Sequence, residues 1–283
     1  MLYDCHGHIF MDGISFREAA ARHKNDPDET AIRTALGALQ SKGVVYFRDG
    51  GDPFGAGLFA RKIAPEYGIE YATCAFAIHK KGHYGGIVGF EWTDLHDYRA
   101  LVKKARELGA QFIKLMYSGL IDFTCYGGIT GVPLERGEIK ELVNIAHAEG
   151  FAVMAHVNGA KAVLDAVECG TDSIEHGCYA DPACFEAMKQ HGTLWVPTLA
   201  AIEGFCGRAG YEGGVPERIL ETQLEAVSQA SKIGVKIACG SDSGAFGVPH
   251  GEGAANEMRL LRQAGVPKAR IDAANIELRQ RFS

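Results

Sequence analysis

Two histidines near the start of the chain have the spacing of a pair that shares one metal ion. His6 and His8 are separated by a single residue within an apolar run, residues 2 to 10. Side chains alternate between the two faces of a β-strand, so residues two apart project from the same face. If this run is a strand, both imidazoles point to one side, where they can bind a divalent cation such as Zn²⁺.

Four more polar residues lie in or just after later apolar runs: Lys114, His156, His176 and Asp242. Each has an ordinary alternative role on its own. A histidine at a strand end commonly forms a hydrogen bond, Asp242 in Ser-Asp-Ser-Gly could shape a turn, and Lys114 could pair with a carboxylate such as Glu175. Together, four histidines and a carboxylate form a nitrogen and oxygen ligand set that suits Zn²⁺, Fe²⁺, Mn²⁺ or Co²⁺. We therefore predict a metal site.

The segments that carry these residues are short apolar runs separated by longer amphipathic stretches. This alternation indicates parallel strands joined by helices. Eight strands are predicted, at residues 2–10, 44–49, 70–78, 112–117, 151–157, 173–176, 194–199 and 236–240. The helices are predicted to end at glycines, which tolerate the positive φ that follows a helix cap, namely Gly109, Gly150, Gly170, Gly192, Gly234 and Gly265.

Eight strand and helix pairs in a chain of this length favour a closed barrel over an open doubly wound sheet. We predict a (β/α)₈ TIM barrel that forms a single domain over residues 1–283. In such a barrel the functional residues lie at the C-terminal ends of the strands. The six polar residues above fall at those ends. Two glycine-rich stretches, residues 82–89 and 204–214, are predicted to be long loops after the third and seventh strands.

The composition is that of a globular protein without a polyanionic partner. The 283 residues include 47% hydrophobic and 23% charged residues, with a formal net charge of -6. No stretch is rich in Lys or Arg, and no apolar run approaches the roughly 20 residues of a membrane span. We expect a cytoplasmic protein that acts on a small-molecule substrate and binds neither nucleic acid nor membrane. The eight cysteines contain no Cys-x-x-Cys pair and are expected to be free thiols, with Cys178 in the core.

The order His-x-His, Lys, His, His, Asp on successive strands resembles the amidohydrolase superfamily. Further similar motifs cover nearly the whole chain and favour its imidazolonepropionase-like and prolidase-like branch. They are Tyr46-Phe-Arg-Asp-Gly-Gly51, Lys114-Leu-Met, Ala155-His-Val-Asn-Gly-Ala160, Ile174-Glu-His-Gly177, Val196-Pro-Thr-Leu199 and Pro249-His-Gly-Glu.

The resemblance implies a binuclear site with two divalent metal ions, Zn²⁺ being the expected identity. His6, His8 and Asp242 would bind the more buried ion, and His156 and His176 the more exposed one. Lys114, carboxylated by carbon dioxide, would bridge both ions together with a hydroxide. A carbamate is anionic and can bind cations that would repel an ammonium. Asp242 would accept the proton of the nucleophile and deliver it to the leaving amine. The implied reaction is hydrolysis of a C–N bond, in an amide, peptide or cyclic amide, of a small polar molecule.

Substrate contacts are predicted from the same likeness. Lys81-Gly-His-Tyr-Gly85 resembles a substrate-binding Gly-Gly-His loop with Lys81 in place of a glycine, which makes His83 a candidate contact. Tyr117, Asn158 and His250 follow family-like positions near the rim. The loops over residues 82–92 and 205–215 are expected to set specificity. The small β-sandwich of many relatives is expected to be absent. His23, His96, His147 and His191, on predicted helices or their ends, are expected to be solvated.

Three alternatives remain open. A mononuclear deaminase or cyclic-amide hydrolase would use His6, His8, a further histidine and Asp242 and leave Lys114 unmodified. A metal-free aldolase would use Lys114 as a Schiff-base lysine, but it would leave four histidines without a role. A binding protein could keep the barrel without turnover. Assembly into a homo-oligomer through an outward helix at residues 254–264 is also possible on this sequence.

Overall fold

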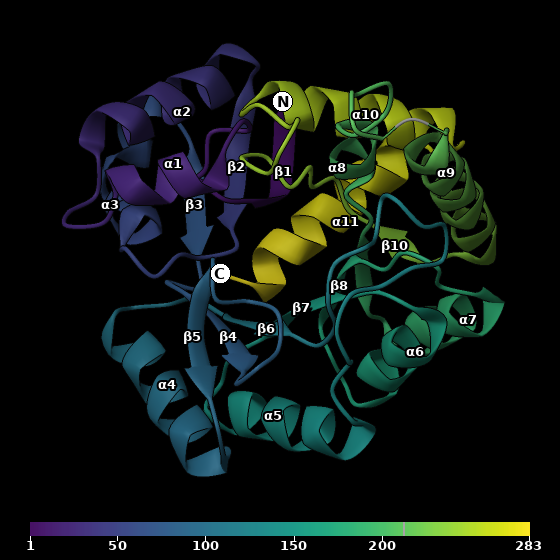
Figure 1. The fold of residues 1–283 in the computed structure, drawn as a ribbon, viewed down its shortest axis with the longest axis horizontal. Coiled ribbons are helices and arrows are strands. Elements are labelled where there is room, and N and C mark those ends of the chain that lie inside the picture. The colour runs from purple at the N-terminus through teal and green to yellow at the C-terminus, as the bar shows by residue number, and fades with distance from the viewer. Residues whose placement is uncertain (212) are drawn as a thin grey trace.

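The centre of the computed structural model, which describes residues 1–211 and 213–283, is a barrel of parallel strands. Helices form a ring around it (Figure 1). The strands are β1 (Leu2–Gly7), β2 (Val44–Asp49), β3 (Glu70–Thr73), β4 (Ala77–Lys80), β5 (Gly89–Trp92), β6 (Ile113–Met116), β7 (Val153–Val157), β8 (Ser173–His176), β9 (Leu194–Val196) and β10 (Lys236–Ile237). The helices are α1 (Phe16–Arg22), α2 (Glu29–Ser41), α3 (Ala56–Ile63), the 3₁₀ helix η1 (Ala64–Tyr67), α4 (Leu95–Glu107), α5 (Arg136–Ala148), α6 (Ala160–Glu168), α7 (Pro182–His191), α8 (Leu199–Glu203), α9 (Val215–Ile233), α10 (Glu252–Gln263) and α11 (Lys268–Arg281).

The strands form two sheets, with the strand orders β1-β2-β3 and β10-β9-β8-β7-β6-β4-β5. Backbone hydrogen bonds between the edges of the two sheets close the barrel. Cys5 N donates to Cys239 O at 2.8 Å, and Gly7 forms a bridge with Ser243. On the other side, Gln111 N donates to Thr73 O at 3.0 Å. These bonds join the two sheets into a closed barrel of parallel strands, and the predicted TIM barrel is therefore confirmed.

The third predicted strand, residues 70–78, is wrong as a single element. Ala75 has a φ of 65°, which ends β3 beside β2 and lets the chain resume as β4 beside β6. An extra strand, β5, pairs with β4 at the end of the predicted glycine loop. Gly89 permits this pairing because a Cβ there would lie 1.7 Å from Ala77 O. A local pattern cannot reveal such a change of partner.

Other local predictions agree with the structure. β2 and β8 have the predicted bounds, whereas β10 is shorter and covers only Lys236–Ile237. The six glycines predicted to end helices all have φ between 68° and 109°. All eight cysteines are unpaired, and Cys178 is buried. Within the described chain, no helix combines the length and apolarity that a membrane crossing requires.

The N-terminal end of the barrel is closed by α11, which runs across the middle of the view in Figure 1. Leu278 and the following Phe282 are buried against side chains of the barrel interior such as Met154. The Arg48 guanidinium lies 4.5 Å from the Phe282 ring and donates to Glu175 at 2.8 Å. Both charged groups are fully buried, so each compensates the charge of the other. This pair forms the floor beneath the candidate site.

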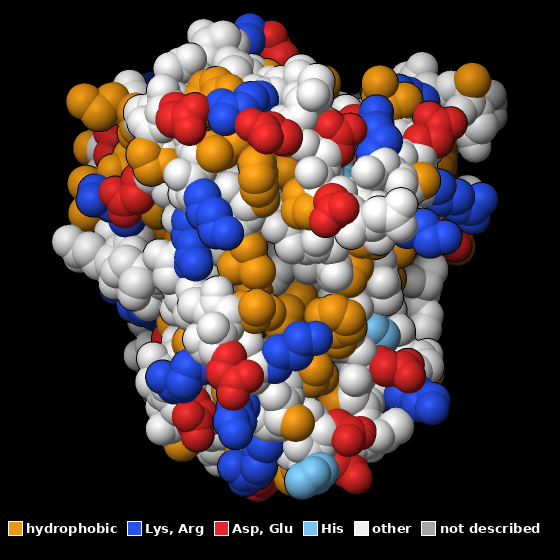
Figure 2. Space-filling model, turned by 90° about the vertical axis from the view of Figure 1, so that its left-hand side faces the viewer, with side chains coloured by type: hydrophobic (Ala, Val, Ile, Leu, Met, Phe, Trp, Pro, Cys, Tyr) orange, Lys and Arg blue, Asp and Glu red, His pale blue; other side chains and the backbone are white. Residues whose placement is uncertain are grey.

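Acidic and basic side chains are interspersed on the face of the molecule seen in Figure 2. Three of the four histidines predicted to be solvated are exposed. His96, His147 and His191 are exposed as predicted, but His23 is buried, with 1% of its surface exposed. Its Nδ1 accepts the backbone N–H of Asp28 and its ring stacks on Phe54, so the prediction of a solvated His23 is wrong. A helix end alone does not reveal such tertiary contacts.

Glu257 on α10 should make stability depend on pH. It is fully buried, accepts Ala200 N at 2.8 Å through Oε2, and has no partner for Oε1 among the described residues. Burial raises the pKa of Glu257 to about 8. The native state then holds a proton that the unfolded chain loses near its usual pKa of about 4.3. The free energy of unfolding should therefore fall as pH rises from about 4.5 to 8, by a few kcal/mol (~1.4 per pKa unit).

Glu257→Gln tests this expectation, because the amide keeps an acceptor for Ala200 N and cannot ionise. We expect denaturant unfolding at pH 5 and pH 8.5 to give a smaller pH dependence for this variant than for the parent. Glu252→Gln, on an exposed face of the same helix, is the matched control and should keep the parental pH dependence. An unchanged pH dependence in Glu257→Gln would contradict a protonated Glu257.

Candidate metal centre and active site

All six predicted ligands line one cavity at the C-terminal end of the barrel strands. The cavity has a volume of about 550 Å³, and its floor holds His6, His8, Lys114, His156, His176 and Asp242. β1 contributes the first histidine, β6 the lysine, and β7 and β8 the next two histidines. Asp242 follows β10, where its N–H donates to His6 O at 2.7 Å. Parallel strands bring these distant residues together because all of their C-terminal ends meet at one rim.

The first three ligands form a compact group. His6 Nε2 and His8 Nε2 each lie 3.6 Å from Asp242 Oδ1. The candidate ligand atoms of the three residues all lie within 4.8 Å of one another. The opposite ring nitrogens are already engaged, His6 Nδ1 with Glu175 Oε2 at 2.7 Å and His8 Nδ1 with Gly51 O at 3.3 Å. These contacts orient both rings so that their Nε2 atoms face a common point, as in many metal sites.

His156 and His176 form the second part of the group. Their ring centroids are 4.5 Å apart, and those of His6 and His176 are 5.1 Å apart. His156 Nε2 lies 3.0 Å from Gly119 O, which leaves Nδ1 available as a ligand. His176 Nδ1 lies 2.7 Å from Thr198 Oγ1, which leaves Nε2 available. Each of the four histidines thus has one ring nitrogen held by a group outside the ligand set, which leaves the other nitrogen as its candidate ligand atom.

Lys114 is buried among these imidazoles without an acidic partner. Its Nζ lies 3.2 Å from His6 Nε2, and none of the described carboxylates forms an ion pair with it. The pairing with Glu175 considered from the sequence does not form, because Arg48 and His6 occupy the Glu175 oxygens. Burial lowers the pKa of Lys114 below its usual value. An unpaired buried ammonium is unfavourable, so this position suits a lysine that is neutral or modified.

The protonation states favour cation binding. Burial, aided by Lys114, lowers the pKa values of His8 and His156 to about 3, and burial also holds those of His6 and His176 well below their usual range. Neutral imidazole is the form that binds metal ions. Burial raises the pKa of Asp242 to about 6, although Lys114 opposes this effect.

Three residues of the site have strained backbone conformations. His176, Thr198 and Asp242 have φ values of 65°, 49° and 62°, and they are three of the five described non-glycine residues with positive φ. This conformation is costly for residues with a Cβ and persists where the surrounding structure enforces it. His176 ends β8, and Thr198 and Asp242 follow β9 and β10 on the same side of the barrel; all three residues line the cavity. Strain concentrated here supports a functional role for the cavity.

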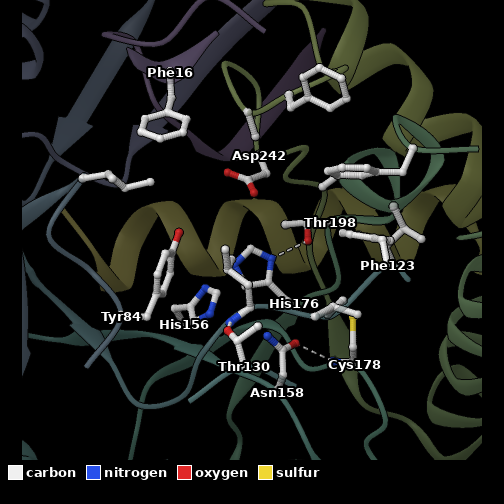
Figure 3. Close-up of a pocket in the computed structure, with 18 of the residues that line it drawn as sticks. Phe16, Tyr84, Phe123, Thr130, His156, Asn158, His176, Cys178, Thr198 and Asp242 are labelled. Atoms are coloured by element: carbon white, nitrogen blue, oxygen red, sulfur yellow. Dashed lines mark hydrogen bonds between the residues drawn. The ribbon is translucent and has the colours of Figure 1, made fainter. Parts of the chain in front are cut away.

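Figure 3 shows the arrangement around Asp242. His176 lies below the carboxylate, with Thr198 on one side and Tyr84 on the other. Asn158 lies deeper, where its Nδ2 donates to Gly119 O and its Oδ1 accepts Cys178 N. The remaining walls are largely apolar, and the small polar substrate expected from the sequence stays a prediction.

Three predicted substrate contacts do not line this cavity. Tyr117 points into the layer between strands and helices, where its hydroxyl lies 3.4 Å from Thr171 Oγ1. His250 is buried against Phe47, with Nε2 bonded to Met11 O. His83 belongs to the predicted loop, but the next residue, Tyr84, provides the side chain in the cavity. A motif places the loop near the site without determining which of its side chains turns inward. Of the four predicted contacts, the structure places Asn158 at the cavity.

Sequence reasoning also missed residues that support the site. Thr198 and Glu175 orient His176 and His6. Thr198 lies in the Val-Pro-Thr-Leu motif, so the sequence drew attention to this segment. The contact between Thr198 and His176 could be identified only in the structure. Phe205 and Tyr211 of the outer wall lie in the loop over residues 205–215 that was predicted to set specificity, whereas Phe123 and Phe246 carried no such signal.

Comparisons with known proteins agree with this geometry. The profile of a family described as "Amidohydrolase family" matches residues 2–277. Ochratoxinase of Aspergillus niger is 33% identical over 277 residues, an alignment that covers 86% of this chain and 57% of that protein. The chain thus spans a little over half the length of this curated relative.

Solved structures share the fold. A Xaa-Pro dipeptidase structure with bound methionine superposes with a TM-score of 0.78 at 20% identity, over 99% of this chain and 75% of the other. The crystal structure of A. niger ochratoxinase gives a TM-score of 0.71 at 24% identity, over 97% and 68% of the two chains. At this level of identity the likeness establishes the barrel fold.

Proposed function

Because the chain belongs to the amidohydrolase family, we propose that it is a metal-dependent hydrolase that cleaves a C–N bond at the centre described above. The observation that carries this proposal is the convergence of four histidines, three buried and His176 partly buried, on Asp242 and Lys114. Each histidine has one ring nitrogen held by a group outside this ligand set. The bond would belong to an amide, a peptide or a cyclic amide. A cytoplasmic location and a homo-oligomer stay predictions of the sequence.

The residues fit two divalent metal ions, with zinc as our proposed identity. His6, His8 and Asp242 would hold one ion, and His156 and His176 the other. Lys114 would join both as an N6-carboxylated lysine, since its buried amine has no acidic partner in the described chain. When bound, such ions polarise a carbonyl group and lower the pKa of water toward neutrality.

The protein groups would then position the substrate and move one proton. The Asp242 carboxylate lies at the centre of the site and can take the proton from the attacking water. The same carboxyl group can give it to the leaving nitrogen, which cannot depart as an anion. Thr198 and Glu175 keep His176 and His6 from rotating away. The apolar walls would exclude bulk water and strengthen these electrostatic interactions.

Tyr84 is our candidate donor to the oxygen of the scissile carbonyl. Its ring packs 5.1 Å from that of His156, and its hydroxyl points into the cavity on the side of Asp242 (Figure 3). Among the described residues none forms a hydrogen bond with this hydroxyl, which leaves it free to donate. A donor aimed at the developing negative charge stabilises the transition state more than the ground state.

Replacing Tyr84 with phenylalanine should lower kcat by about 10²-fold, because it removes one such donor and keeps the ring. KM should change much less. Steady-state kinetics on the best amide substrate test this expectation, and Tyr3→Phe at the opposite end of the barrel is the matched control. A kcat within twofold of the parent would exclude Tyr84 from this role.

The proposed function is tested by metal content and turnover together. Elemental analysis should find two divalent ions per chain, and intact mass before and after acid should show loss of one carbon dioxide. The metal-loaded protein should hydrolyse members of a panel of amides, dipeptides and cyclic amides. Chelation should abolish turnover, and metal addition should restore it. A fully metallated protein without activity on any C–N bond would contradict the proposal.

One observation favours a second candidate, a mononuclear deaminase or cyclic-amide hydrolase. Only His6, His8 and Asp242 form a compact metal-binding group among the described residues. In this alternative Lys114 stays unmodified and acts as a positive charge beside a single ion. One ion per chain without loss of carbon dioxide would favour this candidate.

A further inference from the structure

A fully buried arginine, Arg48, lies beneath the candidate metal centre and does not itself line the cavity. We propose that Arg48 is a positioning residue that sets the metal affinity of the centre. It holds His6 in place through Glu175, and the ring of Phe282 holds Arg48. This inference rests on the proposed function, because it concerns the affinity of the metal site that the function requires. It extends the site to the N-terminal end of the barrel, where Phe282 is buried.

Arg48 acts on His6 at two points. Its Nε donates to Cys5 O at 2.6 Å, and Cys5 directly precedes His6 in β1. Its Nη2 donates to Glu175 Oε1 at 2.8 Å, and the other oxygen of Glu175 lies 2.7 Å from His6 Nδ1. One guanidinium group therefore contacts both the backbone next to His6 and the carboxylate that holds its ring. The rigid plane of this group fixes the angle between the two contacts.

The carboxylate of Glu175 determines which nitrogen of His6 faces the cavity. A carboxylate accepts hydrogen bonds and cannot donate them, so its contact with His6 requires a hydrogen on Nδ1. The lone pair of the neutral ring is then on Nε2, which lies 3.6 Å from Asp242 Oδ1 among the proposed ligands. Ser173 Oγ donates to Glu175 Oε1 and accepts Arg48 Nη1 at 3.0 Å. Glu175 is therefore held at both oxygens, which limits rotation of the His6 ring.

The orientation of Arg48 depends in turn on two aromatic rings. Its guanidinium carbon lies 4.5 Å from the centroid of the Phe282 ring and 5.7 Å from that of Phe112. The two rings meet edge to face, with centroids 5.4 Å apart, and both are fully buried. A ring attracts a cation more strongly when both are removed from water. The nearer ring, Phe282, thereby keeps the guanidinium directed at Glu175.

Compensation of charge alone would not require this geometry. One contact between Arg48 and Glu175 would be enough for that purpose, yet the guanidinium reaches three acceptors, on Cys5, Ser173 and Glu175. Groups that hold a metal-binding histidine from behind orient it, and their loss weakens metal binding by about 10- to 100-fold. We expect Arg48 to act on this scale.

The first test is the affinity for Zn²⁺, measured by competition with a chromophoric chelator, because this measurement needs no substrate. Arg48→Met should raise the Kd by about tenfold or more. Glu175→Gln, which keeps the shape of the side chain without its charge, should raise it by a similar factor. Adding Arg48→Met to Glu175→Gln should then raise the Kd further by less than about threefold, since Arg48 acts through Glu175. A full tenfold effect in both backgrounds would overturn the inference.

Arg48→Lys separates charge from geometry. Lysine keeps the positive charge beside Glu175, but its single ammonium group lacks the planar fork that reaches three acceptors. The Kd for Zn²⁺ should still rise by about fivefold or more. A parental Kd in this variant would show that charge is sufficient, and it would contradict positioning by the guanidinium.

Phe282→Leu tests the same network without leaving a buried charge unpaired, so the variant should fold. It should raise the Kd for Zn²⁺ by about three- to tenfold, because it removes the ring from Arg48. Leu278→Ala is the matched control, since Leu278 is buried in the same cluster. It removes more volume and should lower stability in denaturant more than Phe282→Leu does, yet keep the parental Kd. A parental Kd in Phe282→Leu, or an equal rise in Leu278→Ala, would overturn the inference.

The outcomes also separate this inference from the proposed function. If the parent binds Zn²⁺ and hydrolyses no C–N bond, the proposed function fails, whereas the differences in Kd still decide the role of Arg48. If the parent hydrolyses amides and both Arg48→Met and Phe282→Leu keep its Kd, the inference fails and the proposed function stands. A parent that binds no Zn²⁺ would overturn both.

Discussion

Replacing Asp242 with asparagine should lower kcat/KM on an amide substrate by about 10³-fold or more while the barrel stays folded. Asp242 is both a proposed metal ligand and the proposed proton carrier, and general acid–base catalysis alone contributes 10² to 10⁴ in rate. The asparagine keeps the shape but binds a cation poorly and cannot carry the proton. Kinetics and elemental analysis of the purified variant measure the two losses separately.

The fold itself should survive this change. Burial raises the pKa of Asp242 to about 6, so ionisation of this carboxylate is unfavourable in the metal-free protein. Asparagine cannot ionise and therefore avoids the cost of a buried charge. The metal-free variant should unfold at the same denaturant concentration as the parent or at a higher one. Asp28→Asn, at the N-cap of α2, is the matched control and should keep full activity because asparagine also caps helices well. Retention of more than a tenth of the parental kcat/KM by Asp242→Asn would remove Asp242 from the mechanism.

Replacing Lys114 with alanine should also lower kcat/KM by about 10³-fold, with a loss of bound metal. The side chain is buried, with 1% exposed, and its Nζ lies beside His6 in the middle of the ligand set. If it is carboxylated, its removal takes away a ligand to both ions and leaves a cavity on the floor. A short carboxylate such as propionate should occupy that cavity, because it has the charge and the oxygens of the carbamate, and should restore part of the activity.

Lys114→Met distinguishes loss of the ligand from loss of volume, since methionine fills the space and cannot bind as a carbamate. In the metal-free state this variant should be at least as stable as the parent, because it removes a buried amine that pairs with none of the described acidic residues. Lys140→Ala on exposed α5 surface should leave activity and metal content unchanged. Two ions per chain and near-parental activity in Lys114→Ala would exclude the bridging role. They would also favour the mononuclear alternative, in which Lys114 stays unmodified.

The fold was largely predictable because its signals are local and repeated. Apolar runs, amphipathic helices and glycines with positive φ after helices recur along the chain, and each depends on neighbours a few residues away. The predictions of strands failed where the chain changes the neighbouring strand with which it pairs. The turn at Ala75 and the extra strand β5 depend on which distant strand offers free backbone groups.

The sequence by itself indicated the barrel and the set of six polar residues at one rim, but neither the division of the third strand nor the extra strand β5. It could do so because parallel strands bring their C-terminal ends together, whatever the loops do. The tertiary structure alone decided which nitrogen of each histidine faces the cavity, since the partners Glu175, Gly51, Gly119 and Thr198 come from other segments. It also decided that Tyr84 rather than His83 turns inward. The apolar wall is likewise a tertiary property, because its residues come from loops that are far apart in the chain.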